Sequence, residues 1–247
     1  MDTVAICGLF FVVAVLYASV GHAGASGYLA VMALVGFSAA TMRPTALALN
    51  VAVAAIATVR FARSGWFRWQ AFWPFAVTSI PFAYAAGRLH VETGVLRKAI
   101  GAVLLLAAVR LFVETFRSPK EDAAAEPCNV PRVSAALWGV AIGAAAGLTG
   151  TGGGIFLTPL LVLLGWTGPR IAGAVSAAFI LVNSLAGIAA DPQSMSALPA
   201  ESAAYLVAVV LGGLLGAELG SRRLGGRALR VLLALVLLTA AAKLMLV

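Results

Sequence analysis

Charged side chains are scarce in this sequence, at 11% of its 247 residues, whereas apolar side chains make up 62%. A soluble domain has about 25% charged residues, so this scarcity excludes an ordinary soluble protein. The mean hydropathy of +1.02 indicates a polytopic membrane protein with an all-α fold. At about 20 residues per crossing, the length allows about eight to ten membrane segments and no separate soluble domain.

Cysteine and histidine are also rare, with two of each. Cys7 and Cys128 provide neither a disulfide framework nor a metal-ligand cluster, so we expect no metal and no cofactor. The nine acidic residues stand mostly at the ends of apolar runs, and the sequence pairs no nucleophile with a base. These absences disfavour a membrane-embedded enzyme. No nucleotide-binding motif is present either, so transport would draw its energy from a gradient.

The net charge of +8 comes from basic residues that stand singly or in small groups at the ends of apolar runs. This pattern sets membrane orientation and offers no basic stripe to a nucleic acid. The richest basic loop, residues 222–230, is predicted to be cytoplasmic. Counting back places the 60–68 loop and the 118–132 linker on the same side. It also places Arg88 and residues 97–98 outside, against the positive-inside rule.

The polar linker at residues 118–132 divides the chain close to its middle. It separates a first membrane repeat, residues 1–117, from a second, residues 133–247, and the glycine clusters of the two align in order. We expect apolar segments at about 3–20, 27–40, 45–62, 71–87 and 95–113, then at about 133–149, 154–166, 171–190, 200–219 and 228–247. Five segments in each half would make the halves inverted repeats.

The second segment of each half is short and follows a cluster of glycines. A helix of this length rises about 20 Å, less than the roughly 30 Å of hydrocarbon. Glycine is a poor residue for a helix interior. We therefore predict tilted, re-entrant or broken short helices at these two places.

The second cluster reads Gly150-Thr151-Gly152-Gly153-Gly154, with Pro159 five residues further on, and it has an imperfect repeat at residues 21–29. Together these motifs resemble those of the TauE/SafE family of sulfite exporters, and the resemblance covers essentially the whole chain. It implies a transporter in the bacterial cytoplasmic membrane that exports sulfite, an organosulfonate or a related anion.

A chain that leaves helical geometry inside a membrane presents free backbone N–H groups and the positive end of the next helix dipole, which bind small anions. Hydroxyl groups, including that of Thr158, would add donors. The predicted substrate-binding residues are Gly21, His22, Gly24, Ser26, Gly27, Asn50, Thr149, Gly150, Thr151, Gly152, Gly153, Gly154 and Ser176.

Each of these residues also has a structural interpretation. Glycines let helices pack closely, and buried Asn and Ser side chains often bridge helices. His22 suits either proton coupling or a helix-bridging hydrogen bond. Arg43 and Arg170 either draw anions toward a pore or anchor helices at the interface.

The preferred function is a secondary transporter, with an anion channel, a transporter of another small anion and a non-transporting subunit as alternatives. An inside-negative membrane potential favours export of an anion. The expected partners are a small anionic substrate and the lipid bilayer, and no nucleic acid. The sequence leaves open whether the chain forms a homo-oligomer.

Overall fold

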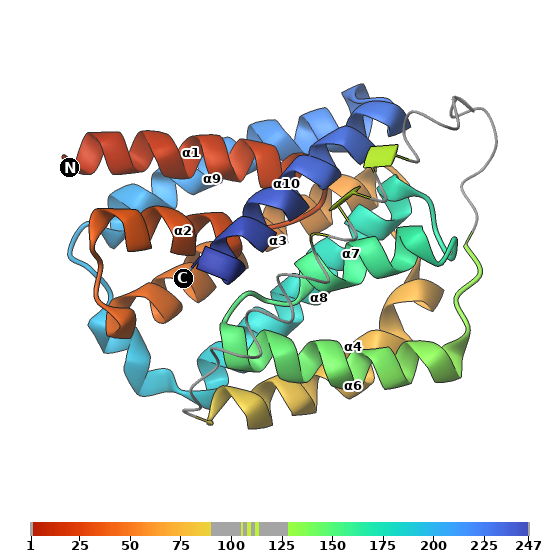
Figure 1. Cartoon of the computed structure of the whole chain (residues 1–247), viewed down its shortest axis with the longest axis horizontal. Helices are drawn as coiled ribbons and strands as arrows, with labels where there is room; N and C mark the ends of the chain where they lie inside the picture. The colour runs from red at the N-terminus through yellow and green to blue at the C-terminus, as the bar shows by residue number, and fades with distance from the viewer. Residues whose placement is uncertain (1, 90–104, 106–107, 110–111, 114–127, 247) are drawn as a thin grey trace.

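The structure is a computed structural model that describes residues 2–89, 105, 108–109, 112–113 and 128–246 (Figure 1). Its helices are α1 (Thr3–Ser19), α2 (Ala25–Val35), α3 (Ala39–Arg63), α4 (Trp69–Gly87), α6 (Arg132–Thr149), α7 (Gly154–Leu163), α8 (Pro169–Ala190), α9 (Ser202–Glu218) and α10 (Gly226–Leu246). A short 3-10 helix, Pro192–Ala197, precedes α9, and a π turn, Leu219–Arg223, follows it.

The all-α membrane fold is confirmed. Within the described ranges, four helices are long and apolar enough to cross a membrane, namely α3, α6, α8 and α9 with its π turn, and α1, α2 and α7 are shorter apolar helices. Large apolar side chains such as Val4, Leu34 and Val133 are exposed on the outside, as lipid contact requires. Most of the segment expected at 95–113 and most of the 118–132 linker lie outside the described residues.

The two short helices lie between glycines with left-handed backbone. Gly24 precedes α2 with φ of 103°, and Gly153 precedes α7 with φ of 83°. Gly36 and Gly165 follow the same two helices with φ of 83° and 66°. Residues with a Cβ rarely adopt this conformation, whereas glycine adopts it freely. The breaks predicted from the glycine clusters are therefore present, and they recur at the same spacing in both halves.

Helix α3 starts earlier than the sequence predicted, at Ala39 instead of about residue 45. Ser38 caps this start, because its Oγ accepts a hydrogen bond from the backbone N of Thr41 at 3.3 Å. Pro44 lies inside the helix. As a result Arg43 stands within α3 and not before it.

Corresponding helices of the two halves make corresponding contacts. Helix α1 packs along α9, and α6 packs along α4, so the first helix of each half lies against the fourth helix of the other (Figure 1). Helices α3 and α8, the third of each half, pack against each other. The colours of Figure 1 show α1 and α6 running in opposite directions along the molecule. The division into two related halves and their inverted orientation in a membrane both stay predictions.

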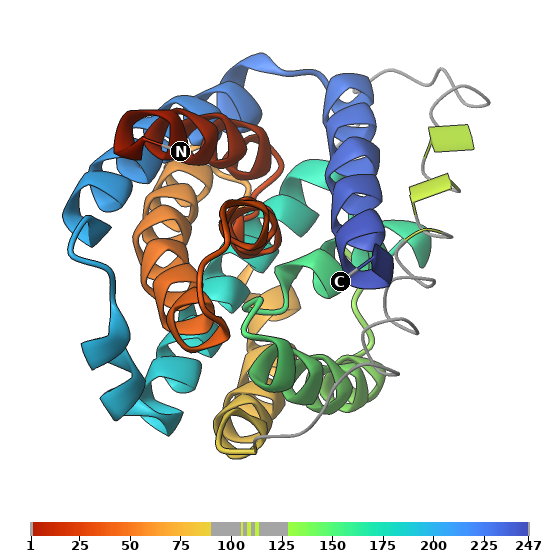
Figure 2. The same ribbon diagram turned by 60° about the vertical axis from the view of Figure 1, so that its left-hand side comes forward.

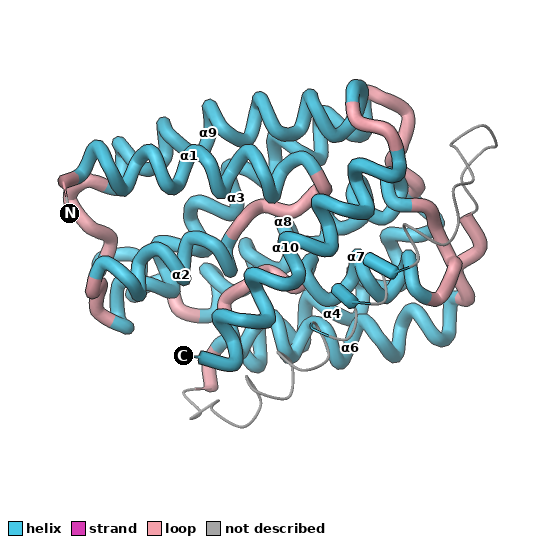
Figure 3. The backbone as a smooth tube through the Cα atoms, turned by 45° about the horizontal axis from the view of Figure 1, so that its top comes forward, coloured by secondary structure: helices cyan, strands magenta, loops and turns pink. Residues whose placement is uncertain are grey.

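Both breaks lie in the interior. Figure 2 shows α2 in the middle of the assembly, with α1, α3 and α10 around it, in agreement with the contacts between these helices. Figure 3 shows the connections from α1 to α2 and from α6 to α7 inside the helix bundle, whereas several other loops lie at its ends. Helix α8, which both breaks contact, is the most buried of the four candidate spans, at 78%. The fold thus brings two stretches of non-helical backbone to its centre.

Candidate functional site

The first break, residues 20–24, is held tightly against α8. Gly21 has φ of 77°, and a Cβ added to it would overlap the backbone of Gly173. The hydroxyl of Tyr28 donates a hydrogen bond to the carbonyl oxygen of Ala23 at 2.7 Å. His22 stands between these two contacts with only 1% of its surface exposed. These contacts therefore hold the imidazole of His22 in the interior of the molecule.

The second break, residues 150–153, contacts both α3 and α8. A Cβ added to Gly152 would lie 2.8 Å from the Oγ of Ser184 on α8 and 3.0 Å from the Nδ2 of Asn50 on α3. A Cβ added to Gly153 would lie 2.8 Å from the Cε1 of Phe179. Both glycines also have left-handed φ angles, 74° and 83°. A side chain at either position would meet strain and a steric clash together.

One buried polar cluster joins the first break to the second half. The Nε2 of His22 lies 2.7 Å from the Oγ1 of Thr158 on α7. The hydroxyl of Thr158 donates a hydrogen bond to the Oγ of Ser176 on α8, also at 2.7 Å. Thr158 and Ser176 are 1% and 0% exposed. These three residues, called here the His22 cluster, connect elements from both halves without a charged side chain.

A second group, called here the Asn50 cluster, consists of Asn50, Thr149, Thr151 and Ser184. The Nδ2 of Asn50 lies 3.4 Å from both the carbonyl oxygen of Thr151 and the Oγ of Ser184. The hydroxyls of Thr149 and Thr151 are 2.9 Å apart. Hydrogen bonds of this type are usually near 2.9 Å, so the Asn50 amide is held weakly. Its N–H groups can turn to another acceptor at little cost.

Among the buried polar atoms with no hydrogen-bond partner in the described structure are the Nδ1 of His22, the Oδ1 of Asn50 and the Oδ1 of Asn183. Asn183 does donate through Nδ2, to the Oγ of Ser79 at 3.1 Å and to the carbonyl of Phe179 at 2.8 Å. Unsatisfied buried polar atoms are uncommon in proteins, and each calls for a ligand, a water or a functional reason. Each of the two clusters contains one such atom.

Helices α2 and α7 both begin at a break, and neither N-terminus has a side-chain cap. Their first-turn N–H groups and the positive ends of their dipoles therefore face the interior without a side-chain acceptor. A Cβ added to Gly154, the first residue of α7, would lie 3.6 Å from the carbonyl oxygen of Ser176. The start of α7 is thus close to the His22 cluster.

The two arginines at the starts of α3 and α8 make helix-bridging contacts. The Nη2 of Arg43 donates to the carbonyl oxygens of Gly87 and Gly147, both at 2.9 Å. These carbonyls belong to the last turns of α4 and α6, where a cation is favoured by the helix dipole. Arg170 donates to the carbonyl of Leu224 at 2.8 Å, and its guanidinium lies 4.8 Å from the ring centroid of Trp66.

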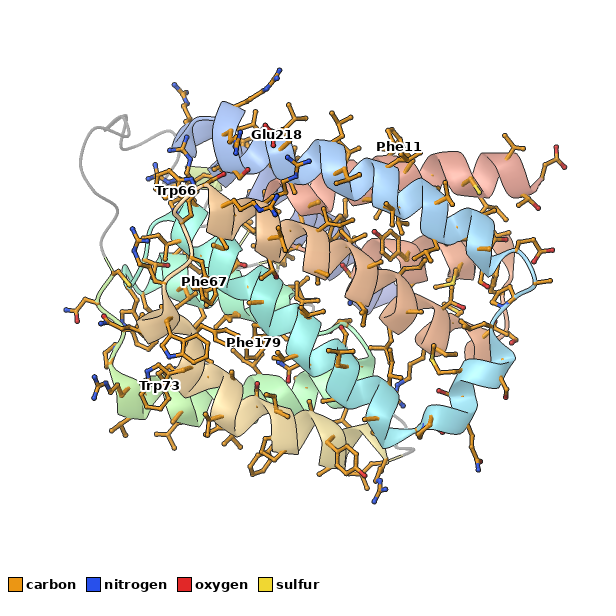
Figure 4. The ribbon with its side chains drawn as sticks, turned by 180° about the vertical axis from the view of Figure 1, so that it is seen from behind. Phe11, Trp66, Phe67, Trp73, Phe179 and Glu218 are labelled. Atoms are coloured by element: carbon orange, nitrogen blue, oxygen red, sulfur yellow. The ribbon has the colours of Figure 1, made fainter. Side chains whose placement is uncertain are left out.

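Aromatic and charged side chains gather at one end. Trp66, Phe67 and Trp73 lie toward the same end of the molecule, whereas Phe179 lies nearer its middle (Figure 4). The ion pair between the Nη1 of Arg60 and the Oε2 of Glu218, 2.9 Å apart, is half-exposed. These groups fit an interfacial belt, and the described contacts do not connect them to either cluster.

The structure brings some predicted residues together and separates others. His22 joins Ser176, and Asn50 joins Thr149 and Thr151, so these residues fall into two clusters. Ser26 joins neither, because its hydroxyl donates to Tyr17 at 3.0 Å. The glycines of both motifs surround the breaks, although Gly27 serves close packing against α1.

Sequence reasoning missed Ser184, Ser79 and Tyr17. Helical spacing offered one signal for Ser184, because it lies eight residues after Ser176 on the same side of α8. Of the residues described, no three His, Cys, Asp or Glu side chains gather as a metal site would require.

Comparison with known proteins gives two matches. The family model described as sulfite exporter TauE/SafE matches residues 6–244. A protein of Sinorhizobium fredii (strain NBRC 101917 / NGR234), described as probable membrane transporter protein y4hK, is 39% identical over 248 residues, covering 99% of this chain and 100% of that protein. No solved structure matches the chain.

Proposed function

Because this chain belongs to the TauE/SafE family of sulfite exporters, a family of membrane transporters, we propose that it carries a small sulfur oxyanion out of a bacterial cell. The substrate is sulfite or an organosulfonate, and the membrane is the cytoplasmic membrane. The site lies between the two breaks, and the transporter works by alternating access.

A single observation carries this proposal: two short helices start, without side-chain caps, at glycine breaks inside the molecule. A helix N-terminus in a dry interior binds an oxyanion through its N–H groups and its dipole. Discontinuous helices in secondary transporters present their N-termini to anionic substrates in this way. The buried His22 and Asn50 clusters add neutral side-chain donors beside these backbone amides.

The energetics favour a small, highly oxygenated anion. A hydrogen bond to a charged group contributes about 1.5–3 kcal/mol, so several converging donors offset the loss of the anion's hydration. Sulfite and sulfonate groups each present three oxygens to such donors. Among the described residues, neither cluster includes a lysine or an arginine. The side chain of Arg43 packs against Gly150 at the second break, but its Nη2 is held by the carbonyls of Gly87 and Gly147, so the anion is bound mainly by dipoles. Weak, reversible binding of this kind suits a carrier that must release its substrate.

The membrane potential supplies a driving force for export. An inside-negative potential favours outward movement of an anion by about 2.3 kcal/mol per charge per 100 mV. In this structure His22, Asn50 and Ser176 are at most 1% exposed, which corresponds to an occluded arrangement. Movement of one half against the other would open the site to either side in turn.

Transport by the purified protein in lipid vesicles tests the proposal. We expect saturable sulfite flux and counterflow, in which unlabelled anion on one side accelerates labelled anion from the other. A channel would give flux without counterflow, and a non-transporting subunit would give neither.

A matched pair of glycine variants assigns the flux to the site. Gly152→Leu places a side chain against Asn50 and Ser184 and should abolish flux. Gly8→Leu makes the same change in α1, where an added Cβ has no atom within 4 Å, and should leave flux intact. Normal flux in a membrane-inserted Gly152→Leu protein would contradict the proposed site.

A further inference from the structure

The hydrogen bonds of the His22 cluster define the protonation of the imidazole. Thr158 has one hydroxyl hydrogen, and it donates that hydrogen to Ser176. Its oxygen must therefore accept a hydrogen bond from His22, which makes Nε2 the protonated nitrogen of a neutral ring. The Nδ1 atom then carries a lone pair, and this buried atom has no partner in the described structure. A proton acceptor with no protein partner among the described residues thus lies at the first break.

We propose that the Nδ1 of His22 is a proton-binding site, and that a proton and the transported anion bind together. The inference rests on the proposed function, because it assigns a coupling role to a residue of the same site. The proton comes from the aqueous phase and forms an N–H bond at Nδ1. The imidazolium that results carries one positive charge, and the sulfonate or sulfite group neutralises it.

The surroundings of His22 leave the anion as the partner for that charge. From α1, the ring of Tyr17 lies 6.4 Å from the imidazole between centroids, and from α2, Tyr28 bonds the neighbouring carbonyl of Ala23. Helices α7 and α8 contribute the hydroxyls of Thr158 and Ser176. No Asp, Glu, Lys or Arg among the described residues interacts electrostatically with His22. A lone buried imidazolium is costly, so we expect His22 to be protonated only when an anion is bound beside it.

Coupling of this kind is reciprocal. If bound anion stabilises the imidazolium, then a proton on His22 raises the affinity for the anion by the same factor. The helix N-termini reinforce the effect, because their positive ends disfavour the imidazolium until the anion is present. Binding of one anion is therefore coupled to binding of one proton at His22.

The test uses isethionate, a sulfonate whose own charge stays constant between about pH 5 and 8, the range in which histidine titrates. Binding to the purified full-length protein is measured by calorimetry across this range. Where one proton is taken up with each anion, the Kd should fall by about tenfold for each unit that the pH is lowered. Calorimetry in buffers of different ionisation enthalpy should independently report uptake of one proton per anion bound.

Two histidine variants make the assignment specific. His22→Gln keeps a neutral donor but cannot titrate, so its Kd should be independent of pH. His90→Gln removes the other histidine of the sequence and should keep the wild-type pH dependence. If His22 had only a bridging role, His22→Gln would retain the wild-type slope, and that result would overturn the proposal.

The outcomes for the wild-type protein separate this inference from the proposed function. Isethionate binding that does not change with pH and takes up no proton would overturn the proton site and leave the anion site standing. A lack of binding of isethionate and of sulfite at every pH would overturn both. The wild-type proton count decides the question even if His22→Gln does not fold.

Discussion

The Nε2 of His22 and the Oγ1 of Thr158 are 2.7 Å apart, although 136 residues separate them in the chain. This contact links the break of the first half to the short helix of the second half. It is buried, and it continues to Ser176 on α8. A movement of one half against the other would have to carry these groups together or separate them. In the proposed transport cycle, the pair therefore lies beside the anion site and between the two parts that would move.

Thr158→Val should impair both stability and transport. The substitution keeps the shape of the side chain but leaves the Nε2–H of His22 and the Oγ of Ser176 without their partner. Loss of a buried partner costs about 1–3 kcal/mol, so the thermal midpoint in detergent should fall. Thr158→Ser retains the hydroxyl and should stay close to wild type. Equal midpoints and equal sulfite flux for the Val and Ser variants would show that the hydroxyl has no role.

Gly153→Ala should disturb the start of α7. Its Cβ would occupy a left-handed conformation, at a cost of about 1–2 kcal/mol, and would lie 2.8 Å from the ring of Phe179. We expect a lower thermal midpoint and reduced anion binding. Gly8→Ala in α1 is the control, because it has free space and helical backbone there. The account would be wrong if the two variants behaved alike.

Asn50→Asp should weaken anion binding and also lower the thermal midpoint, because Asn50 is 0% exposed and burial of an unpaired carboxylate is unfavourable. The two side chains have nearly the same shape, and the amide makes only 3.4 Å contacts that contribute little to stability. A carboxylate beside the second break would repel an anion and remove two N–H donors. Titration with sulfite should give a Kd at least about tenfold higher, which corresponds to about 1.4 kcal/mol. An unchanged Kd would place the anion away from Asn50.

Arg43→Gln should lower stability more than it lowers anion affinity. The guanidinium binds one carbonyl in the last turn of α4 and one in the last turn of α6, and each such charged hydrogen bond contributes about 1.5–3 kcal/mol. The thermal midpoint of the purified variant should therefore decrease, while the Kd for sulfite measured below that midpoint should change little. A stable variant with lost anion binding would instead make Arg43 a substrate ligand.

The sequence predicted the features that have a local cause. Composition indicated a helical membrane protein, and the glycine clusters predicted breaks, because left-handed backbone depends on residues such as Gly24 and Gly153 themselves. The start of α3 was predicted too late, since the cap at Ser38 gave only a weak signal.

Contacts between the halves had no such signal. The sequence indicated His22 and Ser176 as candidates. It could not predict that both form hydrogen bonds with Thr158, because these contacts depend on how the helices pack. The two carbonyls bound by Arg43 could not be predicted for the same reason, since backbone carbonyls are chemically alike in every helix. The sequence thus located the polar groups, and the packing of α3 and α8 decided which of them meet.

The central claim is that backbone amides at the breaks, and not cationic side chains, hold the anion. The most direct measurement is an anomalous difference map from crystals grown with selenite, the heavier analogue of sulfite. The account predicts a peak in the interior within hydrogen-bond distance of the first-turn amides of α2 or α7. A peak beside arginine side chains at the ends of the helices, with none near Gly24 or Gly153, would contradict it.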